Sequence, residues 1–342
     1  MIHVFSERTY CRYCKQILID QTLSDQICSW CKEELKAYNE HFYNHVPLVK
    51  QDIEALLALE KRYGKTIPAF NQGCPNFGFV AEKKRVIALG LWGTYIDTFP
   101  NEICQLDGLE VLNLGYNCLK ALDNFFVNFD KLKELILDYN RFTEIPKEIF
   151  NLKNLKRLSM SNNRLFSLSE SIGLLKNLQI LDLWSNKIKE VPDTIKELKN
   201  LQILDIMNNN LTTLPDSIKE LYSLKAIKLQ YNDLRILPEV FENLPEIESI
   251  QLQFNKLTSI PISLKHLKKL RYLTLQHNLI THLPDIFSEF RILEHVDLEA
   301  NYLTDLPESL ISKNKIKFFN IRDNEFHKSF LQIRKEKLFS KA

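Results

Sequence analysis

The sequence predicts an α/β solenoid in which a curved parallel β-sheet lines the concave face of a repeat array, preceded by a small four-cysteine module and a helix. Two observations predict this fold. From Val86 to Phe326 the chain matches the pattern L-x-x-L-x-L-x-x-N-x-L eleven times, at a constant spacing of 23 residues. Before the array, four cysteines stand in two C-x-x-C pairs, in a stretch that shows no trace of the repeat.

Composition excludes several classes of protein. The 342 residues include 45 basic and 43 acidic side chains, and a net charge of +2 argues against a phosphate-driven nucleic-acid binder. Eight glycines leave little room for glycine-rich phosphate loops. The chain has no apolar run long enough to span a membrane, and its first residues lack the basic and apolar regions of a secretory signal. We therefore expect a cytoplasmic protein whose cysteines are thiols or metal ligands.

The first predicted module covers residues 1–46 and contains Cys11, Cys14, Cys28 and Cys31. Two C-x-x-C knuckles offer four thiolates in tetrahedral geometry, which suits a structural Zn²⁺ ion. Redox or disulfide chemistry and an iron–sulfur site are the alternatives. Residues 32–45 are predicted to form a helix that begins at the second knuckle. The module resembles zinc-ribbon and treble-clef domains, which implies that the metal stabilises a fold too small for a core of its own.

Residues 47–85 are predicted to connect this module to the array. Apolar residues at helical spacing indicate a helix that ends at Gly64. The stretch from Lys65 to Phe77 contains two prolines and a glycine and is interpreted as a loop. The following residues predict a hairpin that turns between Glu82 and Arg85 and caps the open end of the array.

Each position of the repeat, over residues 86–326, has a physical role. The alternating leucines point one face of a short strand inward, and the asparagine amide is expected to bond backbone groups of the neighbouring coil. A proline pre-sets the turn into the convex segment. The asparagines recur at Asn117, Asn140, Asn163, Asn186, Asn209, Asn232, Asn255, Asn278, Asn301 and Asn324. The pattern resembles the intracellular, Ras-group type of leucine-rich repeat, which implies a solenoid and suggests a signalling scaffold.

Outward positions of the repeats are predicted to form a partner-binding surface on the concave face. Large apolar groups facing solvent are typical of interfaces, where Trp, Tyr and Arg contribute most of the binding energy. Trp92 and a ladder of Gln230, Gln253 and Gln276 share these positions. The predicted binding residues are Tyr116, Tyr139, Arg141, Arg164, Trp184, Met207, Tyr231, Phe254 and His277.

One pair of carboxylates is a candidate for acid–base chemistry. Asp182 and Asp205 occupy the same outward position on adjacent strands, and two close carboxylates raise the pKa of one of them. Lys228 occupies that position on the next strand, so we interpret the pair as solvated surface charge with a counter-ion. No residues are assigned to catalysis.

The sequence thus predicts a non-enzymatic scaffold that binds a protein partner, and neither nucleic acid, membrane nor a small-molecule substrate. One alternative is a substrate-recruiting component of an enzyme or effector system such as ubiquitin ligation. The other is nucleic-acid binding by the zinc module, although residues 1–79 carry nine basic and nine acidic side chains. Residues 327–342 are predicted to form a capping helix with a basic tail.

Overall fold

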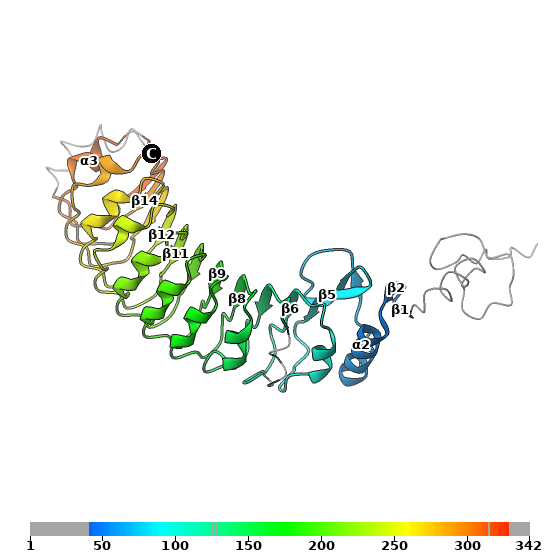
Figure 1. Cartoon of the computed structure of the whole chain (residues 1–342). Coiled ribbons are helices and arrows are strands. Elements are labelled where there is room, and N and C mark those ends of the chain that lie inside the picture. The colour runs from blue at the N-terminus through cyan, green and yellow to red at the C-terminus, as the bar shows by residue number, and fades with distance from the viewer. Residues whose placement is uncertain (1–40, 123, 125, 127–128, 314, 328–342) are drawn as a thin grey trace, which may run out of the picture.

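The fold is taken from a computed structural model, which describes residues 41–122, 124, 126, 129–313 and 315–327. The four cysteines of the predicted zinc module lie outside the described residues, as does the predicted capping helix apart from His327. The described chain forms an arc, with short strands along its inner edge and helical turns along its outer edge (Figure 1).

A β-hairpin stands where the sequence predicts the end of a helix over residues 32–45. Strands β1 (His41–Tyr43) and β2 (Val46–Leu48) pair antiparallel. Asn44 and His45 between them have φ angles of 47° and 67°. Two successive left-handed residues make a tight hairpin turn and cannot belong to a right-handed helix. The helix prediction is therefore wrong for this segment, where Tyr43 packs its ring against Phe79.

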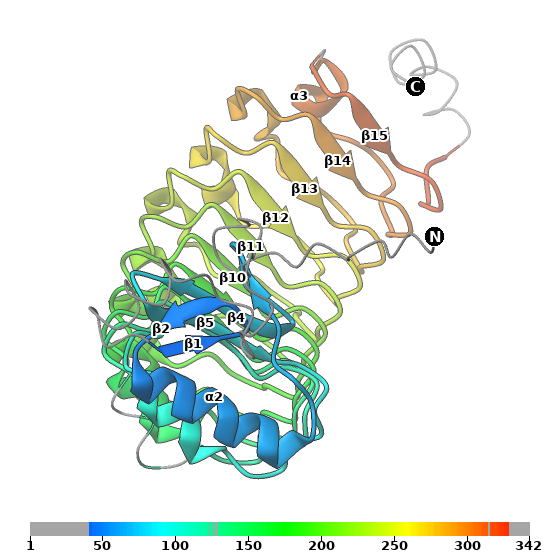
Figure 2. The same ribbon diagram turned by 90° about the vertical axis from the view of Figure 1, so that its right-hand side faces the viewer.

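Helix α2 (Lys50–Tyr63) follows the hairpin and covers the N-terminal end of the arc (Figure 2). Gly64 is left-handed, and its N–H donates to the carbonyl of Glu60, so the helix ends where the sequence predicts. The buried carboxylate of Asp52 accepts from the backbone N–H of Val86 and pairs with the guanidinium of Arg85 at 3.0 Å. These bonds fix the helix to the first strand of the array.

The predicted cap is present as the antiparallel strands β4 (Phe77–Glu82) and β5 (Arg85–Leu91), joined by two left-handed residues, Lys83 and Lys84. A short strand, β3 (Ala69–Phe70), pairs with β4 from the other side. In the described residues, these strands begin a 13-stranded sheet that continues in chain order to β15.

From β5 onward the strands run parallel and pair in a register of 23 residues, as in Ala88 with Val111. This register is the spacing of the sequence pattern. The strands are β6 (Val111–Asn113), β7 (Glu134–Ile136), β8 (Arg157–Ser159), β9 (Ile180–Asp182), β10 (Ile203–Asp205), β11 (Ala226–Lys228), β12 (Ser249–Gln251), β13 (Tyr272–Thr274), β14 (His295–Asp297) and β15 (Phe318–Asn320).

Single helical turns line the convex side, and most of them begin directly after a proline of the repeat. The turns are η1 (Asn101–Gln105), η3 (Lys147–Asn151), η4 (Glu170–Leu174), η5 (Asp193–Glu197), η6 (Asp216–Glu220), η7 (Phe241–Asn243), η8 (Ile262–His266), η9 (Phe287–Glu289) and the short α-helix α3 (Glu308–Ile311). The consensus leucines are fully buried between the two sides and form one continuous core.

The repeated asparagines bond the backbone as the sequence predicts. The Nδ2 group of Asn209 donates to the carbonyls of Leu183 and Ile206 at 3.0 and 3.2 Å. Its Oδ1 atom accepts from the backbone N–H of Ile188 at 2.9 Å. One buried amide thus satisfies backbone groups of two successive coils, and the same pattern recurs along the array.

Candidate binding surface on the concave face

The predicted aromatic residues lie at the edge of the concave face, because each strand is only three residues long. Counting the first leucine of a repeat as position 1, the strands cover positions 3 to 5. Tyr116, Tyr139, Tyr231, Phe254 and His277 stand at position 8, in the turn after each strand, with φ angles between 53° and 57°. Left-handed backbone is costly for such residues, and their N–H groups donate to the next coil in compensation, as from Tyr231 to the carbonyl of Gln253.

These position-8 side chains are exposed and form two separate groups. Near the C-terminal half, Phe254 stacks between Tyr231 and His277, with ring centroids 4.4 and 4.2 Å apart. Rings stacked in this way cover one another's faces, so they present mainly their edges to solvent. Arg141, Arg164 and Lys187, at position 10, are also exposed along this edge, as the sequence predicts.

The other group is the N-terminal patch, formed by Trp92, Tyr116 and Tyr139. The Trp92 ring stacks on Tyr116 at 5.8 Å and meets Tyr139 edge-on at 5.9 Å. It also lies flat over Gly115, where a Cβ atom would stand 2.2 Å from the ring. The absence of a side chain at Gly115 therefore lets Trp92 lie along the sheet, where it contacts both tyrosine rings, which remain partly exposed.

A loop of the chain itself, residues 71–76, covers part of the concave face beside the N-terminal patch (Figure 1). The carbonyl of Asn76 accepts from the backbone N–H of Trp92 at 2.8 Å. A Cβ atom on Gly90 would stand 1.9 Å from the carbonyl oxygen of Pro75, so the loop contacts the strand directly. Cys74 in this loop remains exposed to solvent, although partial desolvation and the nearby carboxylate of Glu134 raise the pKa of its thiol.

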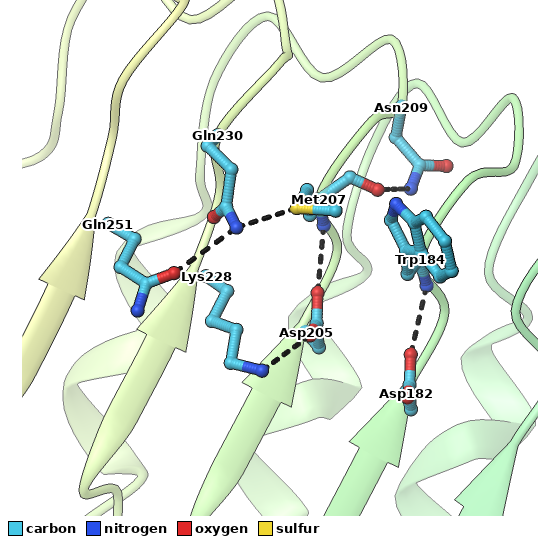
Figure 3. Close-up of polar contacts among 8 residues, drawn as sticks. All are labelled: Asp182, Trp184, Asp205, Met207, Asn209, Lys228, Gln230 and Gln251. Atoms are coloured by element: carbon cyan, nitrogen blue, oxygen red, sulfur yellow. Dashed lines mark hydrogen bonds and ion pairs between the residues drawn. The ribbon is translucent and has the colours of Figure 1, made fainter. Parts of the chain in front are cut away.

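The centre of the concave face carries a different group, which we call the central patch: Asp138, Asp182, Trp184, Asp205 and Met207. Trp184 and Met207 occupy position 7 of adjacent repeats, and both side chains are half-buried (Figure 3). Asp182 and Asp205 are direct partners across β9 and β10. Apolar and acidic side chains thus share one surface on the same strands.

The two central carboxylates have different surroundings. Asp205 forms an ion pair with Lys228, with Nζ and Oδ2 2.9 Å apart, so the predicted counter-ion is present there (Figure 3). Both carboxylates also accept from the backbone N–H two residues further on, Asp182 from Trp184 and Asp205 from Met207, each at 3.2 Å. Desolvation raises the pKa of Asp182 and the carboxylates of Asp205 and Asp138 raise it further, while the Trp184 N–H and the charge of Lys228 lower it without reversing the shift. The predicted counter-ion thus pairs with Asp205, and no described cation pairs with the half-buried Asp182.

The glutamine ladder continues the surface beyond Met207. The Nε2 group of Gln230 contacts the sulfur of Met207 and donates to the Oε1 atom of Gln251 at 3.2 Å (Figure 3). Gln253 accepts from the hydroxyl of Thr274 at 2.7 Å. These side chains are held by one another and form a polar margin on the C-terminal side of the central patch.

Sequence reasoning missed two features of this face. Tyr272, His295 and Phe318 form a second aromatic column at position 3, where His295 and Phe318 stack at 4.2 Å. Their 23-residue spacing was a sufficient signal. The second feature, the loop over residues 71–76, leaves no periodic signal because it does not belong to the repeat.

The described part of the chain contains neither a cluster of metal ligands nor a membrane-spanning helix. Among those residues no group of three or more His, Cys, Asp and Glu side chains is placed to hold a metal ion. The described helices include none that combines the length and the apolar character needed to cross a bilayer.

Family models match the region that forms the array. The model described as "Leucine-rich repeat region" matches residues 167–270, and the model described as "Leucine rich repeat" matches residues 85–141 and 130–188. Together these matches cover more than half of the chain. A comparison with curated protein sequences gives no match.

Solved structures share the fold. The plant peptide hormone receptor RGFR1, solved in complex with RGF2, is 29% identical, with a TM-score of 0.61 over 67% of this chain and 38% of the receptor. The ectodomain of the Arabidopsis thaliana receptor kinase GASSHO1/SCHENGEN3, in complex with CASPARIAN STRIP INTEGRITY FACTOR 2, is 26% identical, with a TM-score of 0.50 over 67% of this chain and 34% of that ectodomain. The Drosophila Toll–Spatzle complex is 20% identical, with a TM-score of 0.63 over 76% of this chain and 38% of its own, and supports the fold alone. The chain thus spans little more than a third of these proteins.

Proposed function

This chain belongs to the leucine-rich repeat proteins, and from that premise we propose that it is a non-enzymatic interaction module that binds a protein partner on its concave face. Leucine-rich repeat domains commonly mediate protein–protein interaction, and two of the similar structures hold a bound partner. The site assignment is taken from the side chains of this chain, because a shared fold does not identify a shared partner.

One observation carries the proposal: the central patch displays Trp184 and Met207 on open strands. Their side chains are half-buried, and the position-7 side chain of the next strand, Gln230, is polar. Large apolar groups on a solvent-facing strand surface are favoured where a partner covers them. A rigid curved sheet also loses little conformational entropy on binding, so more of the contact energy remains as affinity.

The test is affinity capture from a lysate of the native cells, with the full-length chain as bait and Trp184→Glu as the variant. The matched control is Tyr222→Glu, which introduces the same charge at an aromatic residue that is 47% exposed just beyond η6, away from the concave strands. We expect one protein to be captured by the wild type and the control and lost from the Trp184 variant. Retention of that protein by folded Trp184→Glu, checked by circular dichroism, would place binding elsewhere.

For the N-terminal cysteines we propose a structural Zn²⁺ ion held by Cys11, Cys14, Cys28 and Cys31. The support is the spacing of the two C-x-x-C pairs, since these residues lie outside the described part of the chain. Mass spectrometry of the purified full chain is expected to find about one zinc per molecule. The ion should be lost in Cys11→Ser/Cys28→Ser and retained in Cys74→Ser. Equal metal content in all three proteins would contradict the assignment.

A further inference from the structure

Asp182 is a half-buried carboxylate that contacts no cation in the described part of the chain. Its recorded hydrogen bond comes from the backbone N–H of Trp184, at 3.2 Å. An ionised carboxylate away from water is costly unless a cation or several hydrogen-bond donors compensate for the lost hydration.

Its charged neighbours do not supply the missing cation. Asp138, in the turn after β7, accepts from the hydroxyl of Ser159 and the backbone N–H of Ser161 at 2.7 and 2.8 Å. Lys228 on β11 pairs with Asp205 at 2.9 Å. The guanidinium of Arg157 on β8 influences Cys74 on the other side and is not among the charges that act on Asp182. Three carboxylates therefore share one ammonium group, and the central patch is negatively charged.

A second observation points to a missing hydrogen-bond donor at the C-terminal margin of the central patch, two strands beyond Asp182. Gln230 is only 5% exposed, and its Oε1 atom accepts no hydrogen bond from the described residues. Its Nε2 group contacts the Met207 sulfur, so the amide lies at the margin of the central patch (Figure 3). A buried acceptor without a donor costs about 1–3 kcal/mol, which a donor brought by a ligand would recover.

The apolar side chains of the patch restrict the shape of that donor. Trp184 stands two residues beyond Asp182, just after the end of β9, and both side chains belong to the concave face. A guanidinium is flat, stacks on aromatic rings and bonds carboxylates through two parallel N–H groups. A lysine ammonium satisfies the charge but not the stacking.

We propose, resting on the function proposed above, that the central patch binds an extended, basic segment of the partner and that an arginine side chain of that segment pairs with Asp182 and lies against Trp184. The neighbouring ion pair between Asp205 and Lys228 limits the site to one guanidinium. The position-7 glutamines then face the backbone of the segment as it continues toward the C-terminal strands.

The test uses a random twelve-residue peptide library displayed on phage, selected against the full-length chain. Enriched peptides are synthesised, and their affinities are measured by fluorescence anisotropy for wild type, Asp182→Asn, Trp184→Glu and the control Asp193→Asn, an exposed carboxylate on the convex turn η5. We expect a fixed arginine in the enriched peptides. Replacing it by neutral citrulline, or Asp182 by Asn, should weaken binding about 10- to 100-fold, with no further loss when both are changed. Asp193→Asn should have no effect.

The possible results separate the two proposals. Peptides that depend on Trp184 but lack a basic residue, or that bind Asp182→Asn as tightly as wild type, overturn the arginine site and leave the concave-face function standing. Selection that yields no peptide dependent on Trp184 counts against both proposals. Replacement of the fixed arginine by lysine with full affinity would also overturn the assignment, because stacking on Trp184 would then contribute nothing.

Discussion

The N-terminal and central patches of the concave face are built on the same repeat pattern, yet they differ in what their side chains contact. Trp92 stacks on Tyr116, lies over Gly115 and has the loop over residues 71–76 beside it. Trp184, at the same repeat position four coils later, stands beside an uncompensated carboxylate on open strands. The comparison teaches that an aromatic residue at an outward position is not sufficient evidence for a binding site. Aromatic side chains that already pack against other parts of the chain must first be excluded.

The largest expected effect is on stability, and it compares the coils beneath the N-terminal patch with those beneath the central patch. Asn117→Ala and Asn209→Ala should each lower the free energy of unfolding by about 3 kcal/mol, because each leaves several buried backbone groups without partners. Urea unfolding of the full chain measures the loss. A cost below about 1 kcal/mol at one of the two sites would show that the coils there are not equally well ordered.

The next effect separates the two tryptophans. Trp92→Ala should destabilise the protein by about 1 kcal/mol more than Trp184→Ala, since it removes two aromatic ring contacts in addition to apolar burial. Affinity for a partner should respond in the opposite order, with loss for Trp184→Ala and little change for Trp92→Ala. Thermal unfolding and the peptide-binding assay together give both values. Equal effects in both assays would remove the distinction between the patches.

A third experiment lifts the loop from the N-terminal patch. A Cβ atom at residue 90 would overlap the Pro75 carbonyl, so Gly90→Ala should displace residues 71–76 from the sheet. The Cys74 thiol would then lose the desolvation that raises its pKa, become more ionised at neutral pH and react roughly tenfold faster with a maleimide. A Gly90→Ala/Cys74→Ser protein should lack the fast-reacting thiol. Unchanged reactivity would mean that the loop tolerates the methyl group in place.

The smallest effect concerns the pH dependence of stability at Asp182. Its pKa is raised in the folded state, so its stabilising contribution is complete below the ordinary Asp value of about 3.9 and is lost as pH rises through the folded value. Asp182→Asn should therefore be more stable than wild type at pH 7, by about 0.5–1 kcal/mol, and this gain should shrink at low pH.

Thermal unfolding from pH 4 to pH 8 follows this difference. The charged groups that act on Asp182 are Asp138, Asp205 and Lys228, and all are retained in the variant. Asp193→Asn on the convex side serves as the reference for a carboxylate without such surroundings. If Asp182→Asn were less stable than wild type at pH 7, the carboxylate would be compensated by the protein, and the case for a cationic ligand would fail.

The repeated part of the molecule was predictable because it is local. The leucine positions, the asparagine ladder and the strand register each follow from one 23-residue unit that contacts its immediate neighbours. The end of α2 at Gly64 and the hairpin before Val86 were predictable for a similar reason, since turn and cap residues determine the backbone conformation only of the few residues around them. The misassigned helix at residues 41–43 shows the limit of this approach, because residue spacing alone did not reveal that Asn44 and His45 turn the chain back.

By itself the sequence determined that the chain is a leucine-rich repeat solenoid, which buried residues build it and which side chains line its concave face. Only the tertiary structure decided which of those side chains remain available. The loop over residues 71–76 contacts strand β5, and the Trp92 ring packs over Gly115. Lys228 pairs with Asp205 and not with Asp182. These contacts join parts of the chain that do not recur at the 23-residue spacing, so the repeat pattern does not predict them. For that reason the sequence predicted the concave face as the candidate surface, and only the folded structure identified the central patch within it.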